Sequence, residues 1–117
     1  MQVAKWNEVE SKAVAEQGAE GVTIRVLMGD NVGAPTFAMR HFELAQGGST
    51  PYHTHAWEHE VFVLSGRGKV RRKSGESDLE AGSFVYVAPG EEHNFVNAGA
   101  SPFTFLCVIP VARPCAK

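Results

Sequence analysis

The chain has 117 residues, of which 44% are hydrophobic and 9% aromatic, enough for one domain with a hydrophobic core. The 11 Lys and Arg residues against 13 Asp and Glu residues give a net charge of −2. The sequence lacks the basic stripe that nucleic-acid binding needs, and no apolar run reaches the length of a membrane span. The N-terminus lacks the pattern of a signal peptide, and two cysteines, Cys107 and Cys115, are too few for a disulfide framework. We therefore expect a reduced, cytoplasmic protein that binds neither nucleic acid nor membrane.

The predicted elements, taken in chain order, are short β-strands separated by turn residues. Residues 1–20 have too weak a pattern to distinguish a short helix from an irregular arm. The one basic run, from Arg67 to Lys73, is interpreted as a solvated strand edge. Many short strands at steady spacing predict one antiparallel all-β sandwich or barrel. The strands that apolar and β-branched residues predict are Val22–Met28, Thr36–Ala45, His59–Leu64, Lys69–Lys73, Ser83–Val87, His93–Val96 and Phe103–Ile109.

Several of these strands are apolar on both faces. Val61 and Val63 alternate with Phe62 and Leu64, although a strand with one solvated face should alternate between apolar and polar residues. The outer face is therefore expected to be covered, either by the N-terminal segment or by a second subunit.

Four of the five histidines lie in two groups. His53, His55 and His59 directly precede an apolar run, and His93 follows far downstream. Alternate side chains of an extended strand share a face, so His53 and His55 can point the same way, and a turn after them can bring His59 to the same side. Imidazole is the commonest protein ligand for first-row transition metals, so this clustering favours a metal site over a histidine-rich surface loop.

The spacing of the first histidine group resembles the first motif of the cupins, which are double-stranded β-helix, or jelly-roll, barrels. That motif reads G-x5-H-x-H-x(3,4)-E-x6-G. His59 stands where the family's usual glutamate ligand stands, because Glu60, at the longer spacing, leaves only five residues before the last glycine. The matching positions are Gly47, His53, His55 and Gly66.

The downstream histidine lies in a segment that resembles the second cupin motif, G-x5-P-x-G-x2-H-x3-N. Ala88 replaces the proline of the motif, and Pro89 follows it. The two motifs cover about half of the chain, which is thus similar to the single-domain bacterial cupins of the cupin 2, RmlC-like type. The matching positions are Gly82, Gly90, His93 and Asn97.

The resemblance implies a jelly-roll domain over residues 1–117, with residues 1–20 as a less regular arm, and one divalent transition metal per chain. The type of ligand does not distinguish Mn, Fe, Ni, Co, Cu or Zn. Four neutral imidazoles add no charge, so the ion would keep its full positive charge and favour an anionic carboxylate or enolate ligand. The expected metal ligands are His53, His55, His59 and His93.

Arg40 is a candidate for binding the anion. It shares its strand parity with Phe42 and Leu44. An arginine inside a small barrel is costly without an anion, so an inward Arg40 would form a fork for a substrate carboxylate near the metal. In the alternative Arg40 points outward, and the interior is lined instead by Phe37, Met39 and His41.

Other residues near the histidines have two open interpretations each. Tyr52 and Trp57 either form walls of a substrate pocket or simply pack. Glu58 and Glu60 flank His59 and are expected to point away from the barrel, where they support a ligand or are solvated. His41 is interpreted as a rim or outer-face residue rather than a ligand.

Function is less determined than fold, because the resemblance implies a range of chemistry and does not select within it. One hypothesis is a mononuclear metalloenzyme acting on a small carboxylate or oxygenated acid, by dioxygenase, decarboxylase, lyase or isomerase chemistry. The alternative is a non-catalytic module that binds a metal and a small anion, as a sensor or storage protein. We also expect a homodimer, with Val22–Met28 near its interface.

Overall fold

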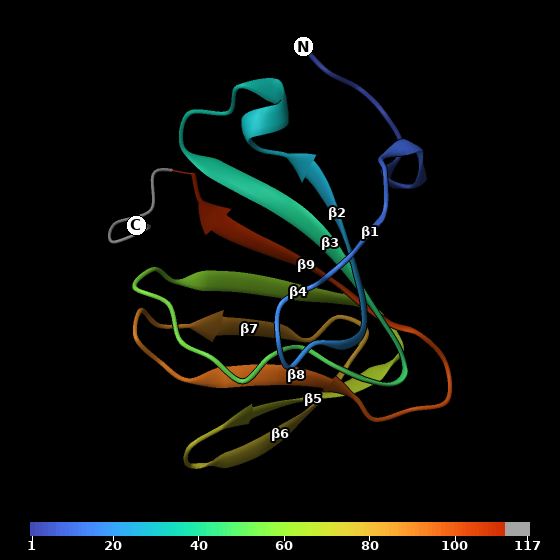
Figure 1. The fold of residues 1–117 in the computed structure, drawn as a ribbon, viewed down its shortest axis with the longest axis vertical. Helices are drawn as coiled ribbons and strands as arrows, with labels where there is room; N and C mark the ends of the chain where they lie inside the picture. The colour runs from blue at the N-terminus through green and yellow to red at the C-terminus, as the bar shows by residue number, and fades with distance from the viewer. Residues whose placement is uncertain (112–117) are drawn as a thin grey trace.

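Nine antiparallel β-strands and two short 3₁₀-helices form the regular structure of the computed structural model, which describes residues 1–111. The predicted all-β barrel is confirmed (Figure 1). Cys115 lies outside the described residues. No helix within residues 1–111 has the length and apolarity to cross a membrane. The elements are η1 (Trp6–Glu8), β1 (Lys12–Ala13), β2 (Glu20–Met28), η2 (Asp30–Val32), β3 (Phe37–Ser49), β4 (His59–Ser65), β5 (Arg67–Arg72), β6 (Gly75–Glu80), β7 (Phe84–Val87), β8 (His93–Asn97) and β9 (Phe103–Pro110).

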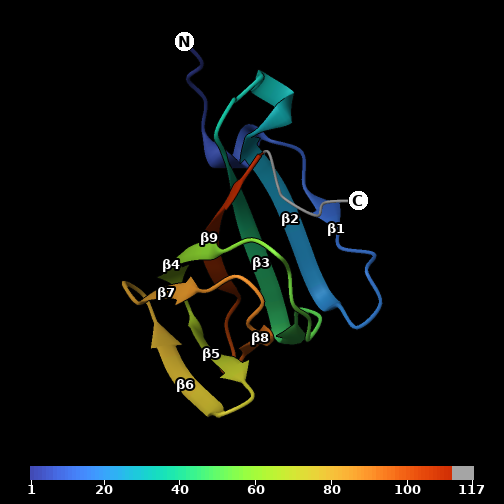
Figure 2. The same ribbon diagram turned by 90° about the vertical axis from the view of Figure 1, so that its left-hand side faces the viewer.

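The strands are hydrogen-bonded in the order β6-β5-β8-β3-β9-β4-β7, with β2 also paired to β3 and β1 to β2. The barrel has two walls, one formed by β2, β9, β4 and β7 and the other by β8, β5 and β6. The long strand β3 links them, because it pairs with β2 and β9 along most of its length and reaches β8 at Ser49. Strand β3 continues beyond the predicted end at Ala45, and Gly47 and Gly48 lie inside it where its register with β2 shifts. The result is a nearly closed barrel (Figure 2).

All seven predicted strands are present, but β6 (Gly75–Glu80) was not predicted. Its residues are mostly polar and carry no apolar alternation, so the sequence signal for a strand is absent. Across the β5–β6 pair, Arg67 lies 3.8 Å from Glu80 and Lys69 lies 3.4 Å from Asp78. The basic run therefore does not form a sheet edge, since β5 is paired on both sides, with β6 and β8.

The hydrophobic core fills the barrel between its two walls. Its largest fully buried side chains are Leu44, Val63, Phe103 and Phe105. Gly66 begins the turn beside this core with a φ of 86°, and a Cβ atom there would lie 2.3 Å from the carbonyl oxygen of Pro102. Glycine at this motif position is therefore required both by the backbone angle and by the close approach of the chain.

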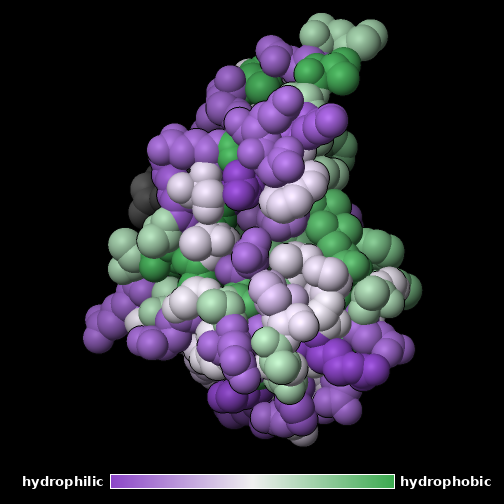
Figure 3. Space-filling model, turned by 90° about the vertical axis from the view of Figure 1, so that its right-hand side faces the viewer, coloured by the Kyte–Doolittle hydropathy of each residue, from purple (hydrophilic) through white to green (hydrophobic). Residues whose placement is uncertain are grey.

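The N-terminal arm, residues 1–19, wraps around the edge formed by β2. Trp6 stacks on His41 of β3 with ring centres 4.7 Å apart. The guanidinium of Arg25 also lies over the Trp6 ring, 5.1 Å from its centre. Arg25 also donates hydrogen bonds to the carbonyls of Asn7 and Val9. Viewed from this side, the surface is mostly hydrophilic, with scattered hydrophobic patches (Figure 3).

The arm covers only one part of the outer surface. On the outer face of β4 and β7, Phe62 is 48% exposed and Phe84 is 81% exposed, and these two residues are cross-strand partners. Leu64 and Tyr86 beside them are also exposed. The apolar side chains on the outer face of β4 are thus uncovered within residues 1–111. On the outer face of β3, His41 packs under the arm against Trp6, whereas Phe37 at the start of the strand is 64% exposed.

Candidate metal and anion site

Four histidine rings form a closed circuit at one end of the barrel. The distances between ring centres are 4.4 Å for His53 and His55, 5.4 Å for His55 and His59, 5.0 Å for His59 and His93, and 5.4 Å for His93 and His53. Each ring thus contacts two of the others. Both histidine groups of the sequence meet here.

The backbone holds these histidines through contacts between segments far apart in the chain. His53 and His93 exchange two backbone hydrogen bonds of 3.1 and 3.0 Å, forming an isolated bridge. The carbonyl of His55 accepts a hydrogen bond from the backbone N–H of Gly90 at 2.7 Å. His59 is the first residue of β4, and His93 is the first of β8. The ring positions are therefore set by the barrel itself rather than by a free loop.

Two of the rings donate a hydrogen bond from Nδ1 to an acceptor outside the circuit. His93 Nδ1 lies 3.0 Å from the carbonyl oxygen of Glu91, and His53 Nδ1 lies 3.1 Å from Oε2 of Glu16. A carbonyl or carboxylate oxygen only accepts, so Nδ1 carries a proton, and in the neutral form of such a ring the lone pair lies on Nε2. This is the arrangement in which a metal-binding histidine is usually held.

Burial and neighbouring charges favour the neutral form of three of the four rings. Burial, followed by the charges of His93 and Arg40, lowers the pKa of His59 to about 3. Burial also lowers the pKa of His93 and, together with the neighbouring His53, that of His55. Neutral imidazole is the form that binds a metal. Nδ1 of His59 is buried without a hydrogen-bond partner.

These observations fit a divalent metal in donor type and in spacing. Imidazoles bound at about 2.1 Å through one nitrogen have ring centres about 3.2 Å from the ion, hence about 4.5–5.2 Å apart at angles of about 90–110°. The four measured distances cover nearly the same range. The side chains are nevertheless not arranged as a formed cluster, because within residues 1–111 no three His, Cys, Asp or Glu groups have the geometry of a metal site.

A cavity of about 400 Å³ extends from the histidines into the barrel. Beyond the four imidazoles its wall is mainly apolar, and the arm contributes Val14 and Glu16 to it. Arg40 is the one arginine or lysine among the described residues that line it. The apolar and aromatic part of the wall consists of Val14, Val22, Ile24, Phe42, Pro51, Trp57, Phe95, Phe105, Cys107 and Ile109.

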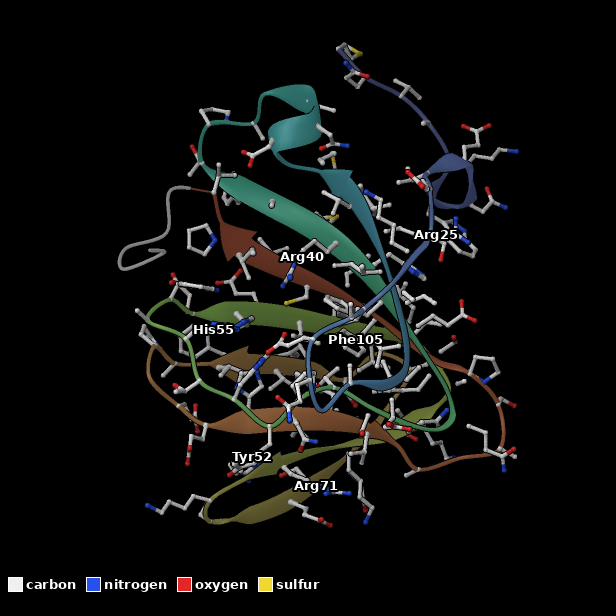
Figure 4. The ribbon with its side chains drawn as sticks, in the orientation of Figure 1. Arg25, Arg40, Tyr52, His55, Arg71 and Phe105 are labelled. Atoms are coloured by element: carbon white, nitrogen blue, oxygen red, sulfur yellow. The ribbon has the colours of Figure 1, made fainter. Side chains whose placement is uncertain are left out.

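Arg40 faces this cavity rather than the outside of the barrel. One of its terminal nitrogens lies 3.0 Å from Sγ of Cys107, its guanidinium lies 4.9 Å from the centre of the Phe42 ring, and its buried Nε has no hydrogen-bond partner. No carboxylate within residues 1–111 forms an ion pair with it. In Figure 4 the Arg40 side chain projects from β3 toward β9 and β4, and Arg40, His55 and Phe105 all line the cavity. A half-buried cation without a counter-ion is suited to bind an anion.

The other candidates are placed differently from one another. Trp57 lines the cavity and stacks on His55, with ring centres 4.3 Å apart and planes inclined by 12°. Tyr52 is 48% exposed and does not line the cavity, and in Figure 4 it lies toward β5 and β6. Glu58 and Glu60 are also absent from the cavity wall, and Glu60 is exposed. Of the three predicted substrate-binding residues, the structure therefore brings Arg40 and Trp57 to the cavity.

Sequence reasoning missed two residues of this site. Glu16 lies in a polar segment without periodicity, and only its contact with His53 distinguishes it from other exposed glutamates. Cys107 was expected to be a small core residue, and it is buried, but its thiol also contacts Arg40. Burial raises the pKa of this thiol, so it is neutral and serves as a polarisable wall for the guanidinium.

Comparison with known proteins gives a consistent family. The polyketide cyclase RemF from Streptomyces resistomycificus is 34% identical over 97% of this chain and 82% of its own, with a TM-score of 0.91. The tetracenomycin polyketide synthase protein TcmJ of Streptomyces glaucescens is 29% identical over 86% of this chain and 68% of its length. The 1-methylthio-D-xylulose 5-phosphate methylsulfurylase of Rhodospirillum rubrum is 28% identical over 93% and 70%. The cupin domain description matches residues 40–109, more than half of the chain, and the jelly-roll barrel agrees with it, so this chain belongs to the cupin family.

Proposed function

We propose that this cupin is a mononuclear metalloenzyme that cyclises an enolisable, oxygen-rich substrate of the polyketide type. The observation that carries the proposal is the cavity itself, which has four imidazoles at one end, a mainly apolar and aromatic remainder, and in its wall one guanidinium without an ion-pair partner among residues 1–111. The relatives named as a polyketide cyclase and a polyketide synthase protein support the choice of substrate class.

One divalent transition metal would be held by His53, His55, His59 and His93. Support comes from the circuit of ring contacts, the lowered pKa values and the Nδ1 hydrogen bonds described above. A divalent ion bound there would supply Lewis-acid stabilisation of a carbonyl or enolate oxygen. All four ligands are neutral, so the ion would keep its charge for the substrate oxygen.

The wall of the cavity selects for a carbon skeleton that is largely apolar. Phe42, Trp57, Phe95 and Phe105 offer aromatic faces, and a cavity of about 400 Å³ is within the range of small-molecule sites. A phosphorylated sugar, by contrast, needs several cationic or backbone donors around its phosphate. The described cavity wall contains a single guanidinium, which favours a delocalised oxyanion over a phosphate dianion.

The chemistry that fits this cavity is an intramolecular aldol condensation. A C–H proton next to one carbonyl passes to solvent, the enolate carbon attacks a second carbonyl carbon, and the alkoxide that forms takes up a proton from solvent. The hydroxyl then leaves as water with one further C–H proton, so that the net change is the loss of one water without any redox change. Arg40 would bind an enolate or carboxylate oxygen by charge-assisted hydrogen bonds. The aromatic wall would exclude water and hold the chain folded so that the reacting carbons meet.

The experiment that tests the proposal has two parts. Elemental analysis of untagged protein should find about one divalent transition metal per chain. The loaded protein should convert a synthetic poly-β-ketone to an aromatic product, and should leave oxalate and sugar phosphates unchanged. Metal without turnover of any of the three substrate types would favour the non-catalytic binding module, and protein that takes up no metal would refute both.

Assembly as a homodimer belongs to the same proposal. The exposed apolar residues on β4 and β7 and the half-exposed Val26 and Met28 of β2 are suited to be covered by a second copy. Light scattering at micromolar concentration should give twice the mass of the chain, and a clean monomer would refute this.

The free thiol of Cys107 supports a reducing compartment such as the cytoplasm.

A further inference from the structure

The N-terminal arm reaches the candidate metal site, although it lies outside the region that matches the cupin description. That match begins at residue 40, whereas Val14 and Glu16 line the cavity. Glu16 therefore lies in the arm, outside the part of the chain that the cupin description matches. Its carboxylate is the one acidic side chain among the described residues that line the cavity.

Glu16 contacts one histidine at the atom that sets the ring's tautomer. Its Oε2 lies 3.1 Å from Nδ1 of His53, and the side chain of His53 is 24% exposed. His93 receives the equivalent contact from a backbone carbonyl, at Glu91. For His53, the Glu16 carboxylate is the only acceptor at Nδ1 within residues 1–111. The orientation of this ring thus depends on a side chain rather than on the main chain.

The arm holds Glu16 in place by backbone contacts on both sides. β1 pairs with β2, and the N–H of Val14 donates to the carbonyl of Val22 at 3.0 Å. The N–H of Ala19 donates to the carbonyl of Glu16 at 3.0 Å, closing a turn at Gly18, whose φ is 96°. A carboxylate presented by a fixed backbone loses less conformational entropy on contacting the ring than a free one would.

We propose that Glu16 is a positioning residue that fixes His53 with the proton on Nδ1, so that Nε2 of this ring presents its lone pair to the metal. The inference rests on the proposed metal site. Free imidazole in a peptide prefers the other tautomer, with the proton on Nε2, so an acceptor at Nδ1 preorganises the ring. Carboxylate partners of this kind typically change metal affinity by about 10–100-fold.

The test compares Glu16→Ala and Glu16→Gln with Glu10→Ala, an exposed glutamate of the same arm that does not line the cavity. Zn²⁺ affinity is measured by competition with a chromogenic chelator. Glu16→Ala should weaken Zn²⁺ binding by about tenfold or more. Glu16→Gln should have a smaller effect, because its amide oxygen still accepts a hydrogen bond, and Glu10→Ala should match the wild type. Equal affinity of Glu16→Ala and wild type would overturn the proposal.

A second measurement uses metal-free protein and separates this inference from the proposed function. Nitrogen-15 NMR of the imidazoles should show His53 protonated at Nδ1 in the wild type and shifted toward Nε2 protonation in Glu16→Ala. Amide exchange in β1 should be unchanged in Glu16→Gln, which shows that the arm remains docked. An unchanged His53 tautomer in Glu16→Ala would refute the positioning role. A wild type that binds no Zn²⁺ would refute the metal site instead, whatever the tautomer.

Discussion

Two buried histidines on opposite sides of the barrel wall show that burial alone does not determine whether a histidine is a candidate metal ligand. His41 and His59 are 4% and 6% exposed, and burial is the largest cause of the lowered pKa of both. His41 lies under the arm, stacked on Trp6, and does not line the cavity. His59 faces the cavity and two other imidazoles.

The difference comes from the alternation of side chains along the strands. Arg40 and His41 are neighbours on β3, so Arg40 points into the cavity and His41 points out to the arm. The same lowered pKa therefore marks a candidate ligand on one face and a packed residue on the other. Shared access to one cavity, rather than burial or protonation, distinguishes the two roles.

The sharpest test of this comparison removes histidines that face the cavity and, separately, the histidine that faces the arm. His59→Ala should weaken metal binding by more than about 100-fold, beyond the effect of losing a ligand's partner, and His55→Ala combined with His93→Ala should empty the site. His41→Ala should keep the wild-type metal content, although it loses packing against Trp6. Elemental analysis and chelator competition measure both. Undiminished metal content in the double variant would contradict the four-histidine assignment.

The second test changes the inward neighbour of His41. Oxalate serves as a dicarboxylate probe. In metal-loaded protein, Arg40→Leu should lower the affinity for oxalate by more than about tenfold, because a bidentate charged contact contributes about 1.5–3 kcal/mol. Metal content should not change. Arg71→Leu is the matched control, because Arg71 is exposed on β5 and pairs with Glu76 away from the cavity. Identical titration curves for Arg40→Leu and wild type would remove Arg40 from the ligand site.

The third test exchanges the chemistry of His59 while keeping its position. His59→Glu restores the glutamate that cupins usually carry, and it should keep the fold and shift metal preference toward Mn(II) or Fe(II) by several-fold. The added negative charge should lower carboxylate affinity. Glu60→Gln is the control and should behave as wild type, since Glu60 is exposed and outside the cavity. Loss of metal in Glu60→Gln would identify Glu60 as the ligand instead.

The smallest expected effect concerns the pH dependence of stability through His41. Burial lowers its pKa, Arg25 lowers it further and Glu43 opposes this. Below about pH 6.5 the unfolded chain therefore binds a proton that the folded state does not, so stability falls as the pH falls. In urea unfolding of metal-free protein, wild type should lose more stability than His41→Gln between about pH 7 and 5. Parallel pH profiles would show that His41 contributes nothing.

The sequence carried the parts of the site that depend on fixed spacing. The histidine positions, the glycines of the turns and Asn97 follow the two motifs, and Asn97 donates from its amide to the carbonyls of Leu44 and Ser101. These residues could be found from the sequence because a particular backbone geometry requires each of them at a fixed spacing within its motif.

Other features had no readable signal. The orientation of Arg40 was open because β3 carries large side chains on both faces, with Phe42 inside and His41 under Trp6. β6 (Gly75–Glu80) is held by backbone pairing and cross-strand ion pairs rather than by apolar alternation. Glu16 depends on how the arm wraps around β2, which is a tertiary property.

The reciprocal backbone hydrogen bonds between His53 and His93 have a consequence for kinetics. The two residues belong to segments far apart in the chain, so their pairing requires closure of a long loop. An ion that needs rings from both segments can bind tightly only after that closure. Such an ion would leave the folding rate nearly unchanged and slow the unfolding rate, because it stabilises the native state without stabilising the transition state. The bound metal would therefore increase kinetic stability without speeding folding.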